Sequence, residues 1–471
     1  MEKLNININD KIKVKPILDP NFTPAVLWNQ EFRKLVAENE QSRDIKISLK
    51  RPRGTISVFE TKVFPNKEQY QEVNLKYVER LVKFLLWAKG GYEVTISGAD
   101  EIAKAIDNIY SESGKRAFDY KIMGEKIYGK PFTVKATSLE NAPKSKEISV
   151  KLGGNMDGCR IGFDLGGSDR KCAATIDGKV VHSEEIEWSP YFEKNPDWHL
   201  EGILDSLKRA AEKLPHVDAI GGSAAGVYVD NQVRIASLFR GVSEKDFQEK
   251  VVNIFDKCAK EYNNIPFIVA NDGDVTALAG AISLNDNAVL GMSMGTSEAV
   301  GYVNGDGNIT DWLNELAFAP VDYRDENSPV DEWSGDEGCG VQYFSQQCVA
   351  RIAPATGIEF PEDMPFPERL VEVQKLMEEN DERAVKIYQT IGVYFAYTIA
   401  HYAEFYDIKN LLILGRVTSG AGGNMILEVA EEVLKNEFPK LAENITFRTP
   451  DEKFKRHGQA VIAATLPSLA V

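Results

Sequence analysis

One segment of the sequence, residues 160–171, reads RIGFDLGGSDRK and joins an apolar run to a pair of glycines. The apolar residues predict a strand, and Gly166-Gly167 predicts a tight turn at its end. Glycine turns after strands let backbone amides approach anionic oxygens closely, because no Cβ stands in the way. The segment is therefore a candidate phosphate-binding turn.

Two further glycine turns follow later in the chain. Gly295-Thr296-Ser297 comes after the predicted strand 288–294, and a glycine cluster from Gly415 to Gly420 follows the predicted strand 411–414. A single Gly-Gly after a strand is usually only a hairpin turn. Three glycine turns at equivalent strand ends indicate a nucleotide site, and the usual P-loop pattern is missing, so the site would be of another kind.

The order of predicted elements gives the architecture. From residue 160, three antiparallel strands precede alternating helices and strands, and the same order recurs from residue 288. This order predicts two similar α/β lobes. Residues 1–150 read instead as α+β, with strands at 45–50 and 54–64 and a strongly apolar helix at 70–89. We expect three domains, 1–150 (α+β accessory), 158–284 (first lobe) and 285–471 (second lobe).

Composition limits the class of protein. Five cysteines in 471 residues argue against a disulfide framework and for a cytoplasmic location. No run of about 18 apolar residues occurs, so we expect no membrane partner. The net charge of −16 divides into +6 for residues 1–150 and −22 for the rest. A mild excess of +6 is typical of a solvated or docking surface, so we expect no nucleic-acid partner and docking onto the core.

The motifs resemble those of the ROK sugar kinases in the actin/hexokinase/Hsp70 superfamily. Residues 161–171 resemble the first phosphate motif, and 294–309 resemble the second. Asn271-Asp272 is similar to the family's Asn-Asp step before a helix, and 414–420 to its adenosine loop. The resemblance implies an α/β fold with a two-lobed actin-like (ribonuclease H-like) ATPase core, here preceded by an α+β N-terminal domain.

The resemblance also implies an activity, the ATP-dependent transfer of a phosphoryl group to a sugar or sugar-derivative hydroxyl. Asp272 would be the general base, and Asp164 would hold Mg²⁺ through water. ATP and its phosphates would be held by Asp164, Gly166, Gly167, Ser168, Gly295, Thr296, Ser297, Gly415 and Gly420. Asn271 and Glu315 would bind the sugar, Glu315 lying in a stretch similar to the family's Gly-Glu-Ile-Gly-His. A homodimer is left open.

The residues alone leave alternatives open for the key carboxylates. Asn271-Asp272 has the pattern of a helix N-cap, and Asp164 that of a turn former. Asp169 stands where the family has Lys or Asn, and its charge would be compensated by Arg170 or Lys171. A later group of acidic residues has the pattern of a solvated loop: Asp322, Asp331, Glu332, Asp336 and Glu337.

The sugar and zinc residues of the family are only partly present. Its zinc- and sugar-binding His is Phe318 here, and its second sugar-binding Glu is Val341. Of its three zinc cysteines only Cys339 remains, because the other two positions are Glu332 and Ser334. We therefore expect no zinc site, and we do not expect plain glucose as the acceptor. A sugar-sensing regulator without efficient kinase activity is the alternative.

Overall fold

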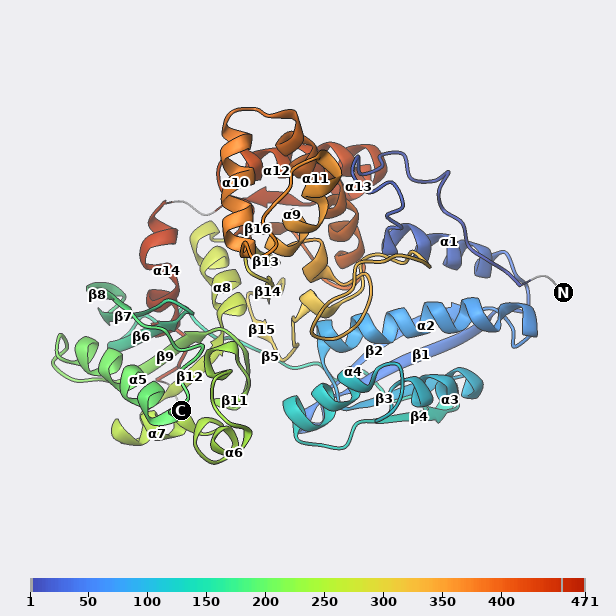
Figure 1. Cartoon of the computed structure of the whole chain (residues 1–471). Coiled ribbons are helices and arrows are strands. Elements are labelled where there is room, and N and C mark those ends of the chain that lie inside the picture. The colour runs from blue at the N-terminus through green and yellow to red at the C-terminus, as the bar shows by residue number, and fades with distance from the viewer. Residues whose placement is uncertain (1–2, 450–451, 470–471) are drawn as a thin grey trace. The chain divides into compact units, whose positions relative to one another are not determined.

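The computed structural model describes residues 3–449 and 452–469, and the chain divides into two compact units (Figure 1). Unit 1 takes its described residues from Met1–Ile148, Met292–Val300 and Asp311–Phe447. Unit 2 takes its described residues from Ser149–Gly291, Gly301–Thr310 and Arg448–Val471. The structure is mixed α/β with several sheets. Within the described residues, no helix combines the length and apolarity needed to cross a bilayer.

Unit 2 is built on a five-stranded sheet of order β12-β9-β6-β7-β8. Strands β6, β7 and β8 are antiparallel neighbours, whereas β9 and β12 run parallel to β6, as the predicted order of elements requires. The strands of the unit are β5 (Ser149–Val150), β6 (Cys159–Leu165), β7 (Asp169–Ile176), β8 (Lys179–Glu187), β9 (Ala219–Ala224), β10 (Val227–Val229), β11 (Gln232–Ile235), β12 (Phe267–Asn271) and β15 (Ile309–Thr310). The helices are α5 (Pro196–Ala211), α6 (Glu244–Asp246), α7 (Ile254–Glu261), α8 (Asp272–Leu284) and α14 (Glu452–Ala464).

Helices cover both faces of this sheet, and two adjacent residues of β6 distinguish the faces. Gly162 faces α14, where a Cβ at this position would lie only 1.7 Å from the carbonyl oxygen of Ala460. Phe163 points to the other face, where its ring stacks on Phe255 of α7 at 5.9 Å between centroids. Because side chains alternate along a strand, Asp164 shares the α14 face with Gly162.

Unit 1 combines the N-terminal residues with the later part of the chain. Its strands are β1 (Arg43–Lys50), β2 (Ile56–Val63), β3 (Glu93–Ser97), β4 (Thr133–Thr137) and β16 (Asn410–Leu414). Its helices are α1 (Ala25–Ala37), α2 (Glu68–Lys89), α3 (Asp100–Ile109), α4 (Ala117–Lys121), α9 (Gln346–Ile352), α10 (Phe366–Glu378), α11 (Glu382–Tyr402), α12 (Gly420–Glu437) and α13 (Pro439–Ala442). Three strands cross from one unit to the other, β13 (Val289–Met294), β14 (Glu298–Val303) and β17 (Thr446–Arg448).

Helix α2 explains why the N-terminal residues belong to unit 1. It connects β2 to β3 in the sheet of order β2-β1-β3-β4, and it is buried almost continuously from Val73 to Lys89. Its Phe84 ring lies 4.6 Å from the ring of His401 on α11. Gly90 ends the helix with φ of 80°, a left-handed value that glycine adopts at low cost. The helix predicted over 70–89 is confirmed, and the described residues of 3–148 pack against the later segments of unit 1.

A buried network of ion pairs joins α2 to the acidic segment 331–337. Lys83 Nζ lies 2.8 Å from Asp119 Oδ1 and 3.3 Å from Asp336 Oδ2, and Arg116 also pairs with Asp336. Burial acts to raise the pKa of Asp336, but the charges of Arg80 and Lys83 hold it below its usual value. Paired, hydrogen-bonded charges tolerate burial that single charges do not.

The prediction of a solvated acidic loop is therefore wrong for three of its five residues. Asp322, Asp331 and Asp336 are buried, with exposed fractions of 2%, 4% and 3%. Asp322 accepts a hydrogen bond from the Tyr343 hydroxyl at 2.7 Å. It also forms an ion pair with Arg324 at 2.6 Å. Of the five residues, only Glu332 and Glu337 are exposed.

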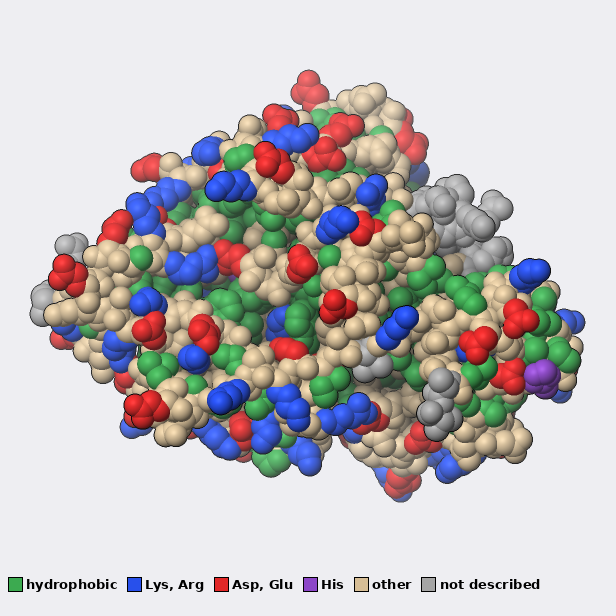
Figure 2. Space-filling model, turned by 180° about the vertical axis from the view of Figure 1, so that it is seen from behind, with side chains coloured by type: hydrophobic (Ala, Val, Ile, Leu, Met, Phe, Trp, Pro, Cys, Tyr) green, Lys and Arg blue, Asp and Glu red, His purple; other side chains and the backbone are tan. Residues whose placement is uncertain are grey.

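The surface seen in Figure 2 is mixed in charge, with Lys and Arg side chains interspersed with Asp and Glu.

Candidate functional site

The first glycine turn, Gly166 to Ser168, connects β6 to β7 in unit 2. The Gly166 N–H donates to the Asp169 carbonyl at 2.9 Å, and the Trp188 indole N–H donates to the Gly166 carbonyl at 2.8 Å. A Cβ on Gly167 would lie 2.0 Å from the Tyr191 hydroxyl. The turn is thus held from both sides, and Ser168 at its tip is exposed.

Asp164 lies one residue before the end of β6, with an exposed fraction of 5%. Its Oδ1 accepts a hydrogen bond from Ser223 at 2.7 Å, and its Oδ2 lies 3.8 Å from Lys171 Nζ. Burial raises the pKa of Asp164 to about 6. Ser223 and Lys171 oppose this rise, whereas the negative charges of Asp272 and Asp169 add to it. Asp164 and Asp272 are therefore close enough to influence each other's ionisation.

Lys171 compensates the unexpected carboxylate of Asp169. Its Nζ lies 2.9 Å from Asp169 Oδ1 and faces Asp164 on the same side of the sheet. Arg170 points to the opposite side, where it donates to Ser206 at 2.5 Å and pairs with Asp205 at 2.6 Å. Of the two candidates, Lys171 is the one that neutralises the turn.

Asn271 and Asp272 stand at the junction of β12 and α8. Asn271 is the N-cap of α8, since its Oδ1 accepts the Gly273 N–H at 2.7 Å. Its Nδ2 donates to the Gly226 carbonyl at 2.7 Å. The carboxylate of the half-buried Asp272 accepts the Gly273 N–H at 3.0 Å, and no cation among the described residues pairs with it. Burial raises the pKa of Asp272, which makes its carboxylate a better proton acceptor.

The second and third glycine turns lie together in unit 1. The Gly295 N–H donates to the Ser297 carbonyl at 3.0 Å, and Thr296 and Ser297 are exposed at the turn. The Val417 N–H donates to the Met294 carbonyl at 3.0 Å, and a Cβ on Gly415, whose φ is 107°, would lie 2.4 Å from that carbonyl. Gly420 begins α12 at the other end of this loop.

Phe318 and Val341, two positions at which the resemblance led us to expect sugar contacts, are both buried. Phe318 is buried in an aromatic cluster, with its ring centroid 4.4 Å from Trp87 and 5.4 Å from Trp333. Val341 is also buried, with an exposed fraction of 4%. The half-buried Glu315 donates its backbone N–H to the Trp87 carbonyl at 2.9 Å. Trp87 of α2 therefore contacts this segment through both its ring and its carbonyl oxygen.

Glu298 is a candidate residue that sequence reasoning missed. It follows the second glycine turn directly, is 3% exposed, and accepts a hydrogen bond from Tyr402 at 3.0 Å through Oε1. Its Oε2 is buried without a hydrogen-bond partner among the described residues. Burial raises the pKa of Glu298 to about 8, and the charge of Glu315 acts in the same direction. The sequence signal for this residue is a single glutamate in the otherwise apolar strand 298–303.

Gly340 lies directly beside the carboxyl group of Glu298. A Cβ on Gly340 would lie 2.1 Å from Glu298 Oε2, so only glycine fits beside it. Gly340 immediately precedes Val341 in the sequence. The Glu298 carboxyl group of β14 therefore lies beside this segment.

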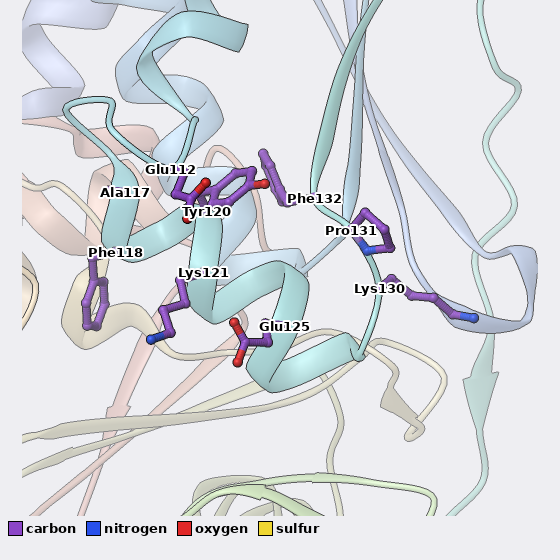
Figure 3. Close-up of a pocket in the computed structure, with 9 residues that line it drawn as sticks. All are labelled: Glu112, Ala117, Phe118, Tyr120, Lys121, Glu125, Lys130, Pro131 and Phe132. Carbon is purple, nitrogen blue, oxygen red and sulfur yellow. The ribbon is translucent and has the colours of Figure 1, made fainter.

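A surface cavity of about 480 Å³ lies elsewhere in unit 1 and involves none of the predicted site residues. Figure 3 shows that most of its lining comes from the helical segment around α4, with Lys130, Pro131 and Phe132 on the following strand segment. In the same view the Phe118 ring and the Lys130 side chain point away from each other. The polar groups of this cavity do not converge on one point, unlike those around Asp164.

Comparisons with known proteins give the fold. No protein-family model matches the sequence, and no curated protein matches it. Among solved structures, a ROK hexokinase from Thermus thermophilus matches with a TM-score of 0.51 and 17% identity, over 66% of this chain and 97% of that one. A ROK-family transcriptional regulator, a homologue of the E. coli MLC protein, matches with a TM-score of 0.52 and 18% identity, over 66% of this chain and 78% of that one. About two thirds of the chain therefore has a fold similar to that of these two ROK proteins, one a hexokinase and the other a transcriptional regulator.

Proposed function

We propose that this protein is an ATP-dependent kinase that acts on a sugar or sugar-derivative hydroxyl. In the reaction, the bond between the γ-phosphorus and the bridging oxygen of ATP breaks, and a new bond forms between that phosphorus and the acceptor oxygen. Asp272 takes the acceptor's proton, and ADP is the leaving group. The observation that carries the proposal is the Asp272 carboxylate, half-buried, unpaired by a cation among described residues, and electrostatically coupled to Asp164.

The donor set around the first turn fits Mg²⁺. The ion prefers carboxylate oxygens and keeps several waters, and Asp164 offers a carboxylate whose Oδ1 is fixed by Ser223. When bound with ATP, Mg²⁺ supplies positive charge to the phosphates during transfer. Lys171 holds Asp169 and faces Asp164, so it limits the negative charge that the phosphates meet. Within unit 2, the amides of the turn at Gly166 bind phosphate oxygens, and the roles of Gly295 and Gly415 in unit 1 stay predictions.

The changed sugar shell favours a derivative over plain glucose. Burying a hydroxyl without a partner costs about 1–3 kcal/mol, and Phe318 and Val341 offer none. An apolar substituent such as the acyl group of an N-acyl sugar matches an aromatic cluster better. We therefore expect amino or N-acyl sugars to exceed glucose in kcat/KM.

A coupled assay of ADP formation across hexoses, amino sugars and N-acyl sugars tests the proposal. We expect ADP formation that depends on one acceptor class, with a phosphorylated product identified by mass spectrometry. ADP formation that is the same with and without every acceptor would contradict a sugar kinase.

The second candidate is a sugar-sensing regulator, favoured by the similarity to the MLC-like regulator and by the altered sugar shell. The burial of α2 in unit 1 disfavours it, because that helix presents no free basic face for DNA. A gel-shift assay on genomic fragments separates the candidates. Sequence-specific retardation at about 0.15 M salt would support the regulator, since that salt screens weak nonspecific contacts.

A further inference from the structure

Three side chains with metal-binding atoms meet on the β7–β8 hairpin of unit 2. Cys172 lies on β7, whereas His182 and Glu184 lie on β8, and their ligand atoms are all within 4.8 Å of one another. Cys172 is directly opposite Glu184, and Ala174 is opposite His182. All three side chains therefore belong to one face of the hairpin.

A bulge in β8 helps to bring His182 onto this face. The pairing register shifts between Ala174 and Thr175, so that Val181 is the extra residue between Val180 and His182. The side chains of Val180 and Val181 are exposed, with fractions of 50% and 48%, whereas His182 is half-buried. Bulges commonly re-aim a side chain in this way.

Two observations indicate that these groups lack their natural partner. The Nε2 atom of His182 is buried and has no hydrogen-bond partner among the described residues. It lies 3.4 Å from Glu184 Oε2, while the other oxygen of Glu184 pairs with Arg209 at 2.9 Å. One carboxylate oxygen is thus oriented by an arginine and the other faces the imidazole, the arrangement of a ligand with an outer partner.

We propose that Cys172, His182 and Glu184 bind a divalent transition metal ion, Zn²⁺ by preference. One thiolate, one imidazole and one carboxylate suit zinc and exclude the hard ions Mg²⁺ and Ca²⁺. Three protein ligands leave the fourth position of a tetrahedron to water or to an external ligand. This site goes beyond the proposed kinase function, and it departs from the sequence-based expectation of no zinc site, which rested on the residues around Cys339.

The ion would sit on the face of the hairpin opposite the phosphate turn. Cys172 is paired with Phe163, which faces α7, whereas Lys171 is paired with Asp164 on the α14 face. A metal here ties β7 to β8 without touching Asp164 or Lys171. Its expected effect is to stabilise the hairpin that leaves the turn.

A second group, Cys159, His216 and Asp218, satisfies the same distance criterion but is a weaker candidate. The Asp218 oxygen that faces His216 at 3.2 Å already accepts the Cys159 N–H at 2.8 Å. The His216 side chain is 64% exposed, and neither of its ring nitrogens is among the buried atoms that lack a hydrogen-bond partner. This group supplies a matched control.

Cobalt titration of the chelator-treated full-length chain tests the proposal. Co²⁺ bound to a thiolate gives a sulfur-to-metal absorption band, which oxygen-only sites such as Asp164 cannot give. We expect one equivalent of Co²⁺ with this band, bleached by Zn²⁺ but not by Mg²⁺. The band should vanish in Cys172→Ser and persist in Cys159→Ser.

Because Cys172 is buried, its replacement could unfold the hairpin, and His182→Asn provides a second test at a half-buried position. We expect Zn²⁺ to raise the melting temperature of the natural chain and to leave that of His182→Asn unchanged. Absence of the sulfur band in the natural chain, or its persistence in Cys172→Ser, would overturn the proposal.

Discussion

Two glycine turns, at Gly166 and at Gly295, each connect two neighbouring strands of a sheet, yet their charges differ. The first, at Gly166, is surrounded by Asp164, Asp169 and Lys171, and its carboxylates influence one another. The second, at Gly295, offers exposed hydroxyls and amides. The one carboxyl group that follows it, Glu298, is buried with a raised pKa. The two turns therefore differ in charge, since the first carries interacting carboxylates and the second carries exposed hydroxyls with one buried carboxyl group behind it.

The Asp272→Asn variant should show the largest effect. Asparagine keeps the size of the side chain and an oxygen for Gly273 N–H, but it cannot take a proton. We expect kcat to fall by about 10²–10⁴ with nucleotide binding retained. Asp274→Asn, two residues along the same helix, is the matched control and should retain most of the activity. Equal values of kcat for Asp272→Asn and the natural chain would contradict the role of Asp272 as general base.

The Mg²⁺ requirement separates the two turns directly. Asp164→Asn should raise the Mg²⁺ concentration needed for half-maximal activity by about 10–100-fold, because the carboxylate that orients the ion's waters is lost. Ser297→Ala on the second turn should alter the KM for ATP and leave the Mg²⁺ requirement unchanged. The assignment of metal to unit 2 fails if both variants shift the Mg²⁺ curve equally.

Gly415→Ala should loosen the packing of the two turns of unit 1. A Cβ there meets the Met294 carbonyl at 2.4 Å in a left-handed backbone, so we expect about 1–3 kcal/mol lower unfolding free energy and weaker ATP binding. Gly420→Ala is the control, since its φ of 69° is also left-handed but nothing lies within 4 Å. Urea denaturation gives the free energy of unfolding of both variants, and the difference between them measures the effect of the contact with the Met294 carbonyl. Equal losses of unfolding free energy in the two variants would show that this contact has no effect on stability.

Glu298 should give unit 1 a pH-dependent stability. Its pKa is raised from 4.5 to about 8, so across that range the folded chain holds a proton that the unfolded chain has released. Stability should therefore fall as pH rises through this window, by up to about 1.4 kcal/mol per pH unit, and level off above about pH 8. Glu298→Gln should lack this component, and the exposed Glu337→Gln should retain it. Identical pH slopes for the natural chain and Glu298→Gln would contradict a neutral Glu298.

Local signals predicted much of the fold. The helix expected over 70–89 is Glu68–Lys89, and the strand expected over 160–165 is Cys159–Leu165, because hydrophobic period and glycine stops are properties of adjacent residues. Helix α10, Phe366–Glu378, was not predicted, since prolines flank its start and few of its residues are buried. Its buried residues, Leu370, Val373 and Met377, do have helical spacing, so this pattern was a signal that the sequence analysis missed.

The sequence could not predict partners that lie far apart in the chain. Asp336 looked solvated because its cations, Arg80 and Lys83, stand about 250 residues earlier. Strand alternation showed that Arg170 and Lys171 point to opposite faces, but only the fold decides which face holds Asp164. Asn271 was expected at the sugar, and the structure shows its oxygen capping α8. Its role in sugar binding stays a prediction.

The central claim is that the carboxylate at the start of α8 drives phosphoryl transfer to a sugar derivative. Incubating the full-length chain, Mg²⁺ and a panel of N-acyl and amino sugars with ATP labelled in its γ-phosphoryl group tests this most directly. We predict label in one acceptor class with the natural chain, and at least about 10²-fold less with Asp272→Asn. Label found only in inorganic phosphate or left in ATP, while a sugar of the panel binds the chain, would contradict the claim.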